Sequence, residues 1–184
     1  PEYFKINDKF CRIVYAHGYP RTVEAGFLDK IVSSLGDFDL SLHIRPYPIE
    51  NMLIDINREL QKQRADLFSM SSKGIINPTL EIQHKDTKST LEALQKGQER
   101  LFNVGLYVNC KADSLEQLNL LTKKVESELN SIMILPRVAN LKMMQGFKSI
   151  APLGIDKLNI TRNITTEALS AFFPFTSQFL EVDD

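Results

Sequence analysis

The stretch FNVGLYVNC, residues 102–110, decides the fold that this sequence predicts. Its β-branched and aromatic residues are typical of a strand. Asp113 or Ser114 follows and can cap a helix over residues 115–129, where apolar side chains recur at helical spacing. Residues 132–138 then predict another strand, and the proline within it favours the edge of a sheet, because proline has no amide hydrogen to donate.

The amino-terminal part of the chain has the same order of strand, helix and strand. Residues 9–15, KFCRIVY, alternate as a strand does. Thr22 can cap a helix over about 23–35, which Gly36 ends. The inner face of that helix is predicted to carry Phe27, Leu28, Ile31 and Leu35. Residues 38–44, FDLSLHI, predict the second strand.

The second strand alternates strictly between apolar and polar side chains. Phe38, Leu40 and Leu42 share one face, and Asp39, Ser41 and His43 share the other. A serine, a histidine and an aspartate on one face raise the question of a nucleophile. Alternate residues of a strand stand roughly 7 Å apart, which we take as too far for a hydrogen bond between nucleophile and base. We therefore expect a solvated or interface-facing surface, with these three residues as interaction candidates.

Between the two halves the apolar spacing becomes helical. Residues 49–70 predict one long helix, and Gly74, Asn77 and Pro78 predict a break. A second long helix is predicted to continue to about Arg100. Its seam is predicted to carry Leu80, His84, Thr87, Leu91, Leu94, Gln98 and Leu101. Two long helices joined by a short turn predict an antiparallel hairpin, and its polar distal seam favours a part that projects from the body.

These elements predict an α+β fold, a ferredoxin-like sandwich of two βαβ halves with the long helical hairpin inserted at about residues 48–101. The predicted domain covers residues 1–158, including a short helix within 139–150. Residues 159–184 form a carboxyl-terminal segment, with one short helix at about 165–172.

Four phenylalanines surround Pro174 near the end of the chain: Phe172, Phe173, Phe175 and Phe179. They carry too much apolar surface for a free tail. We expect them to pack onto this domain or to dock onto whatever follows Asp184. Phe172, Phe173 and Phe175 are the interaction candidates, and at least two of these three rings are predicted to be buried.

The sequence offers no candidate site for nucleotide or metal. The nearest approach to a P-loop, Ser72-Lys73-Gly74, has the wrong residue order, and none of the eight glycines forms a G-x-G-x-x-G motif. His17, His43 and His84 have no ligand-spaced partner in the sequence. We therefore predict no catalytic, cofactor-binding or metal-binding residue and no ATPase activity for this chain.

The charge pattern argues against a nucleic-acid grip. The formal net charge is -1, and the basic residues of the predicted helices alternate with acidic ones. The alternative function is a nucleic-acid-binding ferredoxin-like module, for which Phe102 and Tyr107 would offer stacking rings. The two cysteines, Cys11 and Cys110, are predicted to be reduced buried thiols, or a disulfide if their strands are neighbours.

Five short motifs, taken in order, resemble the type IV secretion ATPases, the VirB-type fourth component and its TraC/TrbE-like relatives. The motifs are Tyr19-Pro20-Arg21 with Val23 and Gly26-Phe27-Leu28; residues 39–44 with Pro46; Leu101-Phe102 with Leu106-Tyr107, Ala112 and Leu115; Gly146-Phe147 with Ser149 and Pro152-Leu153; and Thr165-Thr166 with Ala168 and residues 173–176. Phe27 stands where tryptophan is usual in the family.

This resemblance implies an energy-supplying ATPase of a conjugation or secretion apparatus, cytoplasmic and peripheral to the inner face of the cell membrane. The family's Walker motifs would lie beyond Asp184, so ATP and magnesium are expected for the parent protein and not for this chain. The implied role is an amino-terminal assembly domain. Its implied partners are its own ATPase domain, other subunits of the same protein and inner-membrane channel components, without direct nucleic-acid binding.

Overall fold

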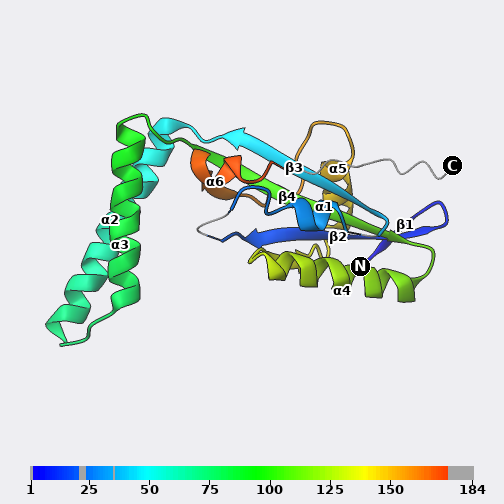
Figure 1. Cartoon of the computed structure of the whole chain (residues 1–184), viewed down its shortest axis with the longest axis horizontal. Coiled ribbons are helices and arrows are strands. Elements are labelled where there is room, and N and C mark those ends of the chain that lie inside the picture. Colours follow the sequence, from blue (N-terminus) through cyan, green and yellow to red (C-terminus); the bar gives the residue numbers. More distant parts are fainter. Residues whose placement is uncertain (1, 21–23, 35, 174–184) are drawn as a thin grey trace. The chain divides into compact units, whose positions relative to one another are not determined.

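The computed structural model describes residues 2–20, 24–34 and 36–173 (Figure 1). The chain divides into two compact units. The sheet unit comprises residues 1–45 and 103–184, and the helical unit comprises residues 46–102. Within the described ranges, every helix is too short or too polar to cross a membrane.

The sheet unit is built on a mixed α/β arrangement around two long central strands. β2 (Lys9–Gly18) and β4 (Leu101–Ala112) pair antiparallel, from Phe10 opposite Ala112 to Tyr15 opposite Tyr107. β3 (Phe38–Pro46) lies on the other side of β4. The far side of β2 pairs antiparallel with β1 (Phe4–Ile6) and then with β5 (Leu135–Val138). β6 (Arg162–Thr165) also pairs with β4.

The four predicted strands are therefore present, with longer or shorter bounds, whereas β1 and β6 were not predicted from the sequence. Both are short, at 3 and 4 residues, and too few to show an alternation. Pro136 belongs to β5 and lies opposite Ala16 of β2, the strand with which β5 pairs.

Both faces of the sheet are covered (Figure 1). α4 (Leu115–Ser131), which Ser114 caps, lies on one face, and its Leu118, Val125 and Leu129 are fully buried. α5 (Met143–Ile150) covers the other face. The core there comprises Ile13, Tyr107, Ala139, Met143 and Leu158. Leu115, the first residue of α4, is exposed.

The helix predicted over about 23–35 is much shorter. α1 spans only Asp29–Val32, and residues 25–28 form a turn with Gly26 at φ +75°. A left-handed residue ends a run of right-handed helical backbone, so the helix begins only after this turn. Residues 21–23 and 35, which include the predicted cap Thr22, lie outside the described residues.

Cys11 and Cys110 are both free and buried. They lie on neighbouring strands, but Cys11 is opposite Lys111 and Cys110 is opposite Arg12. Because successive side chains of a strand point to opposite faces, this offset places the two thiols on different faces of the sheet. The interpretation as reduced buried thiols is confirmed.

The helical unit contains α2 (Ile49–Ser72) and α3 (Pro78–Gln95). Met52, Leu94 and Leu101 form a buried cluster at the end where the unit begins and finishes. Farther along, the interface is polar, as Gln63 is buried and donates to Thr87 Oγ1 at 3.2 Å. α3 ends earlier than the predicted Arg100.

The turns of the helical unit have simple causes. Gly74, at φ +69°, lies in the connection between the helices, and Asn77 caps α3 by accepting from the Leu80 amide. Gly97, at φ +71°, follows α3 and accounts for its early end.

Candidate functional site

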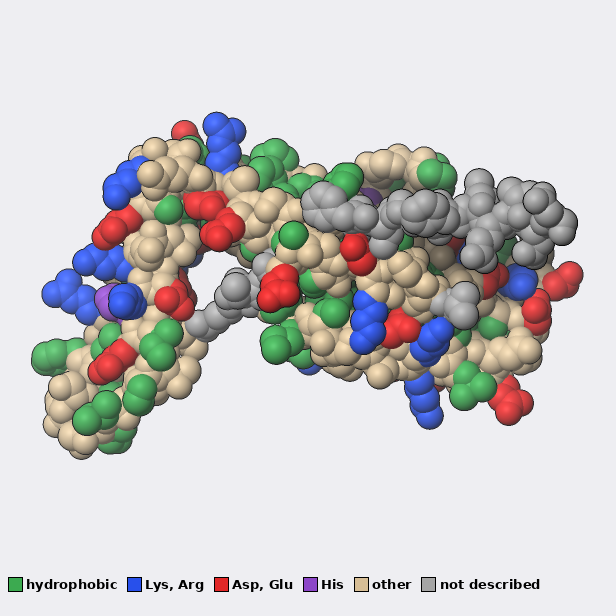
Figure 2. Space-filling view, in the orientation of Figure 1, with side chains coloured by type: hydrophobic (Ala, Val, Ile, Leu, Met, Phe, Trp, Pro, Cys, Tyr) green, Lys and Arg blue, Asp and Glu red, His purple; other side chains and the backbone are tan. Residues whose placement is uncertain are grey.

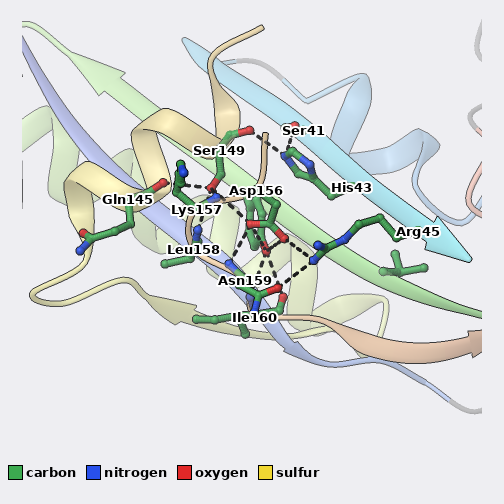
Figure 3. Close-up of polar contacts among 12 residues, drawn as sticks. Ser41, His43, Arg45, Gln145, Ser149, Asp156, Lys157, Leu158, Asn159 and Ile160 are labelled. Carbon is green, nitrogen blue, oxygen red and sulfur yellow. Dashed lines mark hydrogen bonds and ion pairs between the residues drawn. The ribbon is translucent and has the colours of Figure 1, made fainter. Parts of the chain in front are cut away.

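The polar side chains of β3 face a network of hydrogen bonds (Figure 3). Ser41 and His43 are half-buried, and their Oγ and Nε2 atoms lie 3.2 Å apart. The prediction that alternate residues are too far apart to bond is therefore wrong. The spacing of roughly 7 Å describes the backbone, whereas these two side chains lean toward each other along the strand.

This contact does not create a nucleophile. The His43 Nε2 atom also lies 2.7 Å from the carbonyl oxygen of Ser149. A carbonyl oxygen only accepts, so Nε2 carries a hydrogen and donates it. That nitrogen then has no lone pair with which to remove the Ser41 proton.

Asp39 does not join this pair. It accepts from Lys111 Nζ at 2.9 Å and from Asn109 Nδ2 at 3.1 Å, and its side chain is about half exposed. Ser41 and His43 thus form one pair that is half-buried, whereas Asp39 forms an ion pair with Lys111 of β4. Of the expected solvated or interface-facing surface, the solvated alternative does not describe Ser41 and His43, which are half-buried, and the role of these residues in an interface stays a prediction.

The centre of the network is the carboxylate of Asp156, whose side chain is 3% exposed. It accepts from donors on β3, β4 and its own loop: Arg45 Nη2 at 3.2 Å, Tyr107 hydroxyl at 3.1 Å and Asn159 amide at 2.8 Å. Ser149 Oγ on α5 lies 3.3 Å from the same carboxylate. Arg45 also donates to Asn159 Oδ1 at 2.8 Å. We call the set Arg45, Tyr107, Ser149, Asp156 and Asn159 the polar clamp.

Tyr107 connects the clamp to the core. Its ring is fully buried, and its hydroxyl accepts from the Ile160 amide at 3.2 Å. Burial raises the pKa of Tyr107, and the neighbouring Asp156 charge raises it further. Gly105 makes room for this hydroxyl, because a Cβ there would lie 2.6 Å from it.

Ser149 fastens the loop to α5. Its Oγ accepts from the amides of Lys157 and Leu158, at 2.8 and 2.9 Å, and donates to the Gln145 carbonyl at 2.9 Å. Ser149 and Asp156 therefore bond mainly to groups of the same network. This arrangement holds residues 156–160 against the sheet.

A second cluster surrounds the phenylalanines near the carboxyl end. α6 (Thr166–Ser170) leads to Phe172, which is 2% exposed. Its ring centroid lies 4.7 Å from that of Phe27, edge to face, and 5.6 Å from that of Tyr19. Phe173 is 64% exposed, and Phe175 lies outside the described residues.

Other kinds of site find little support in the described ranges. No group of three or more histidine, cysteine or carboxylate side chains there could hold a metal. A hollow of about 230 Å³ lined by Met144, Gln145, Lys148 and Lys157 is small for a ligand site. Tyr107, one of the two rings proposed for base stacking, has no exposed face, which disfavours the nucleic-acid alternative.

Most of the clamp escaped the sequence analysis. Arg45, Ser149, Asp156 and Asn159 lie up to 114 residues apart, and no spacing or motif links them. The available signals were His43 on the polar face of a predicted strand, and Tyr107 and Ser149 within two of the short motifs.

The fold and the clamp together define an α+β domain whose buried polar groups hold its own segments together. Comparison with known families identifies it further. The chain belongs to the CagE, TrbE, VirB family, a component of the type IV transporter system, which matches residues 3–156. The matched range contains four of the five clamp residues, Arg45 on β3, Tyr107 on β4, Ser149 on α5 and Asp156. The resemblance drawn from the sequence motifs is confirmed. No curated protein matches the chain.

Proposed function

We propose that this chain is the non-catalytic amino-terminal domain of a conjugative DNA-transfer or type IV secretion ATPase. In this role it assembles the motor and docks it to inner-membrane channel components. The observation that carries the proposal is the family match over residues 3–156. The polar clamp supports it, because its buried groups bond to one another and stabilise a scaffold.

The fold proposed for this role is a ferredoxin-like sandwich over residues 1–158 with a helical hairpin inserted at about 48–101. The strand order β5, β2, β4, β3 supports the sandwich, and the length of α2 and α3 supports the hairpin. Residues 159–184 would then lead to an ATPase domain beyond Asp184, which would bind ATP and magnesium.

The location and the partners follow from the same role. The domain would lie in the cytoplasm, peripheral to the inner face of the membrane, and contact other subunits and channel components. Among the candidate residues, Asp39 and Phe173 are exposed and suit a contact with a partner. Phe172, Ser41 and His43 would support that surface from within, and Phe175 stays a candidate.

The test of this role is co-purification. An affinity-tagged chain is expressed in cells that carry the transport system, and inner-membrane channel components are identified in detergent extracts. We expect the chain to retain them, and Asp39→Ala or Phe173→Ala to lower the recovery more than Glu116→Ala on exposed α4. Recovery of channel components by the full-length parent, but not by this chain, would place the docking function elsewhere.

The second test concerns nucleotide. Because the sequence has no glycine-rich phosphate loop, isothermal titration of ATP into the purified chain should give no binding heat. Binding in the micromolar range would contradict the non-catalytic assignment.

A further inference from the structure

The helical unit ends in an exposed group of large apolar side chains. Phe68 is 78% exposed and Ile76 is 80% exposed, with Ile75 and Ile82 more than half exposed. They come from the end of α2, the connection and the start of α3, so they gather where one helix passes into the other. We call these four residues the apolar tip. Figure 2 shows hydrophobic side chains grouped at this end of the helices.

Packing of α2 on α3 does not account for the apolar tip. The helices bury Met52, Gln63 and Leu94 and half-bury Leu67 and Leu80 between them. Phe68 follows Leu67 directly and therefore points about 100° away around the helix. Large apolar side chains held in water at one place mark a contact surface.

Several backbone amides at the tip already have hydrogen-bond partners within the chain. The Gly74 amide donates to the Ser71 carbonyl at 3.0 Å, and the Ile75 amide donates to the Met70 carbonyl at 2.9 Å. The Leu80 amide donates to the Asn77 side chain at 3.1 Å. An unpaired amide is costly in an apolar medium, so these bonds lower the cost of burying the connection.

Charge favours one kind of occupant. Residues 62–88 carry five basic residues, Lys62, Arg64, Lys73, Lys85 and Lys88, against three acidic ones, in a chain with a formal net charge of -1. Lys73 lies inside the tip, between Phe68 and Ile75. A long lysine side chain can keep its ammonium at phosphate level while its neighbours enter an apolar layer. An exposed lysine among exposed phenylalanine and isoleucine side chains matches an anionic lipid surface.

We propose that the apolar tip is a lipid-contacting site. Phe68 and Ile76 enter the boundary between headgroups and acyl chains of an anionic bilayer, and Lys73 contacts the phosphates. This inference rests on the proposed function only for its location, the inner face of a membrane. The contact itself involves no channel component, so it can be tested on the purified chain and can fail separately from docking.

The first measurement uses the absence of tryptophan from the sequence. Phe68→Trp places a single fluorophore in the tip, and Leu120→Trp places one on α4 at a site that is 65% exposed. Vesicles of phosphatidylcholine with phosphatidylglycerol should shift the emission of the tip variant to shorter wavelength. They should leave the α4 variant unchanged, and vesicles of phosphatidylcholine alone should shift neither.

The second measurement is co-sedimentation of the whole chain with the anionic vesicles. Phe68→Ser with Ile76→Ser should weaken binding about tenfold or more, because two large apolar side chains no longer leave water. The matched control, Leu120→Ser with Met133→Ser, removes two exposed apolar side chains elsewhere and should bind as the original chain does. Lys73→Glu should weaken binding, whereas Lys123→Glu should have a smaller effect.

Several results would overturn the proposal. An unshifted tip tryptophan, equal shifts at both sites, or equal binding to neutral vesicles would each do so. A Phe68-dependent dimer in analytical ultracentrifugation without lipid would assign the tip to a second copy of the chain instead. If channel components still co-purify with a tip variant that has lost vesicle binding, lipid contact and docking use different residues, and both proposals stand.

Discussion

Tyr107 shows how one side chain organises a site that no sequence motif reveals. Its hydroxyl contacts Asp156 and Ile160, which lie 49 and 53 residues later in the chain. The sequence placed Tyr107 on a strand, but Tyr107 shares its register with Asn103, Gly105 and Asn109, so the pattern does not indicate that this face of the strand is buried as well. His43 was recognised as a candidate, whereas its partner is a backbone carbonyl, which carries no residue-specific signal.

We predict that Tyr107→Phe destabilises the chain. The substitution removes a donor to Asp156 and leaves the Ile160 amide without its acceptor, which costs roughly 1–3 kcal/mol. Urea denaturation measures the loss in the free energy of unfolding. Tyr3→Phe, at a partly exposed ring, is the control and should change it little. Equal stability of both variants would show that the clamp does not hold the loop.

The buried thiol of Cys110 predicts a loss of stability at alkaline pH. Burial raises its pKa from 9.0 to about 12. Above pH 9 the unfolded chain releases the thiol proton while the folded chain keeps it, so stability falls as pH rises toward 12. Each pH unit in that window can cost up to about 1.4 kcal/mol. Below pH 9 this group has no effect.

The measurement compares unfolding free energies of the original chain and Cys110→Ala across that window. The cavity left by the substitution lowers the free energy of unfolding by the same amount at every pH. The comparison therefore uses the slope of the free energy of unfolding against pH. The variant should show the shallower decline. Identical slopes would mean that the thiol ionises as easily in the folded chain as in the unfolded one.

At the scale of elements, the sequence predicted the helices and caps that depend on residues close together in the chain. The long helices, the break between them at Gly74 to Pro78 and the Ser114 cap follow from spacing and side-chain chemistry within a few residues. The amino-terminal helix was predicted too long, because the turn at Gly26 depends on its surroundings. β6 was missed because its pairing with β4 is made across about 60 residues of chain and leaves little local pattern.

α5 depends on a glycine where it crosses β2. A Cβ on Gly146 would lie 2.6 Å from Ile13 Cγ2. Gly146→Ala should therefore push the helix away from the sheet and cost about 1–3 kcal/mol, despite the better helix propensity of alanine. Thermal denaturation gives the comparison, with Met144→Ala on the exposed side of α5 as control. A stabilised Gly146→Ala variant would contradict the close packing of α5 on β2.

The two helices should be separable from the sheet. Replacing residues 62–88 with a short linker keeps Met52, Leu94 and Leu101, which form the buried cluster of the helical unit. We expect circular dichroism to show a folded sheet unit, and assembly of the full-length parent to weaken. The double variant of Phe68 and Ile76 is the control that separates loss of the tip from loss of the helices. An unfolded deletion variant would make the helices part of the core.

At the scale of the whole chain, Phe172 fixes the last described segment to the sheet unit. Phe172→Ala should cost about 3–5 kcal/mol, because the ring is buried against Tyr19 and Phe27. Phe173→Ala, at an exposed ring, should cost less than about 0.5 kcal/mol. Hydrogen exchange across residues 168–173 should accelerate in the first variant only. Fast exchange there in the original chain would show that Phe172 does not hold this segment on the sheet unit.

The first and last residues of the helical unit lie side by side, which has an evolutionary consequence. The Tyr47 amide donates to the Leu101 carbonyl at 2.9 Å, so the chain enters and leaves the helices at adjoining points of β3 and β4. An insertion whose ends already meet adds little closure entropy when it grows. Whole turns, each about 5.4 Å, can be gained or lost without re-registering a strand. Lineages that share this sheet are therefore free to vary the reach of the helices, and a reporter protein grafted at Gly74 should leave the sheet intact.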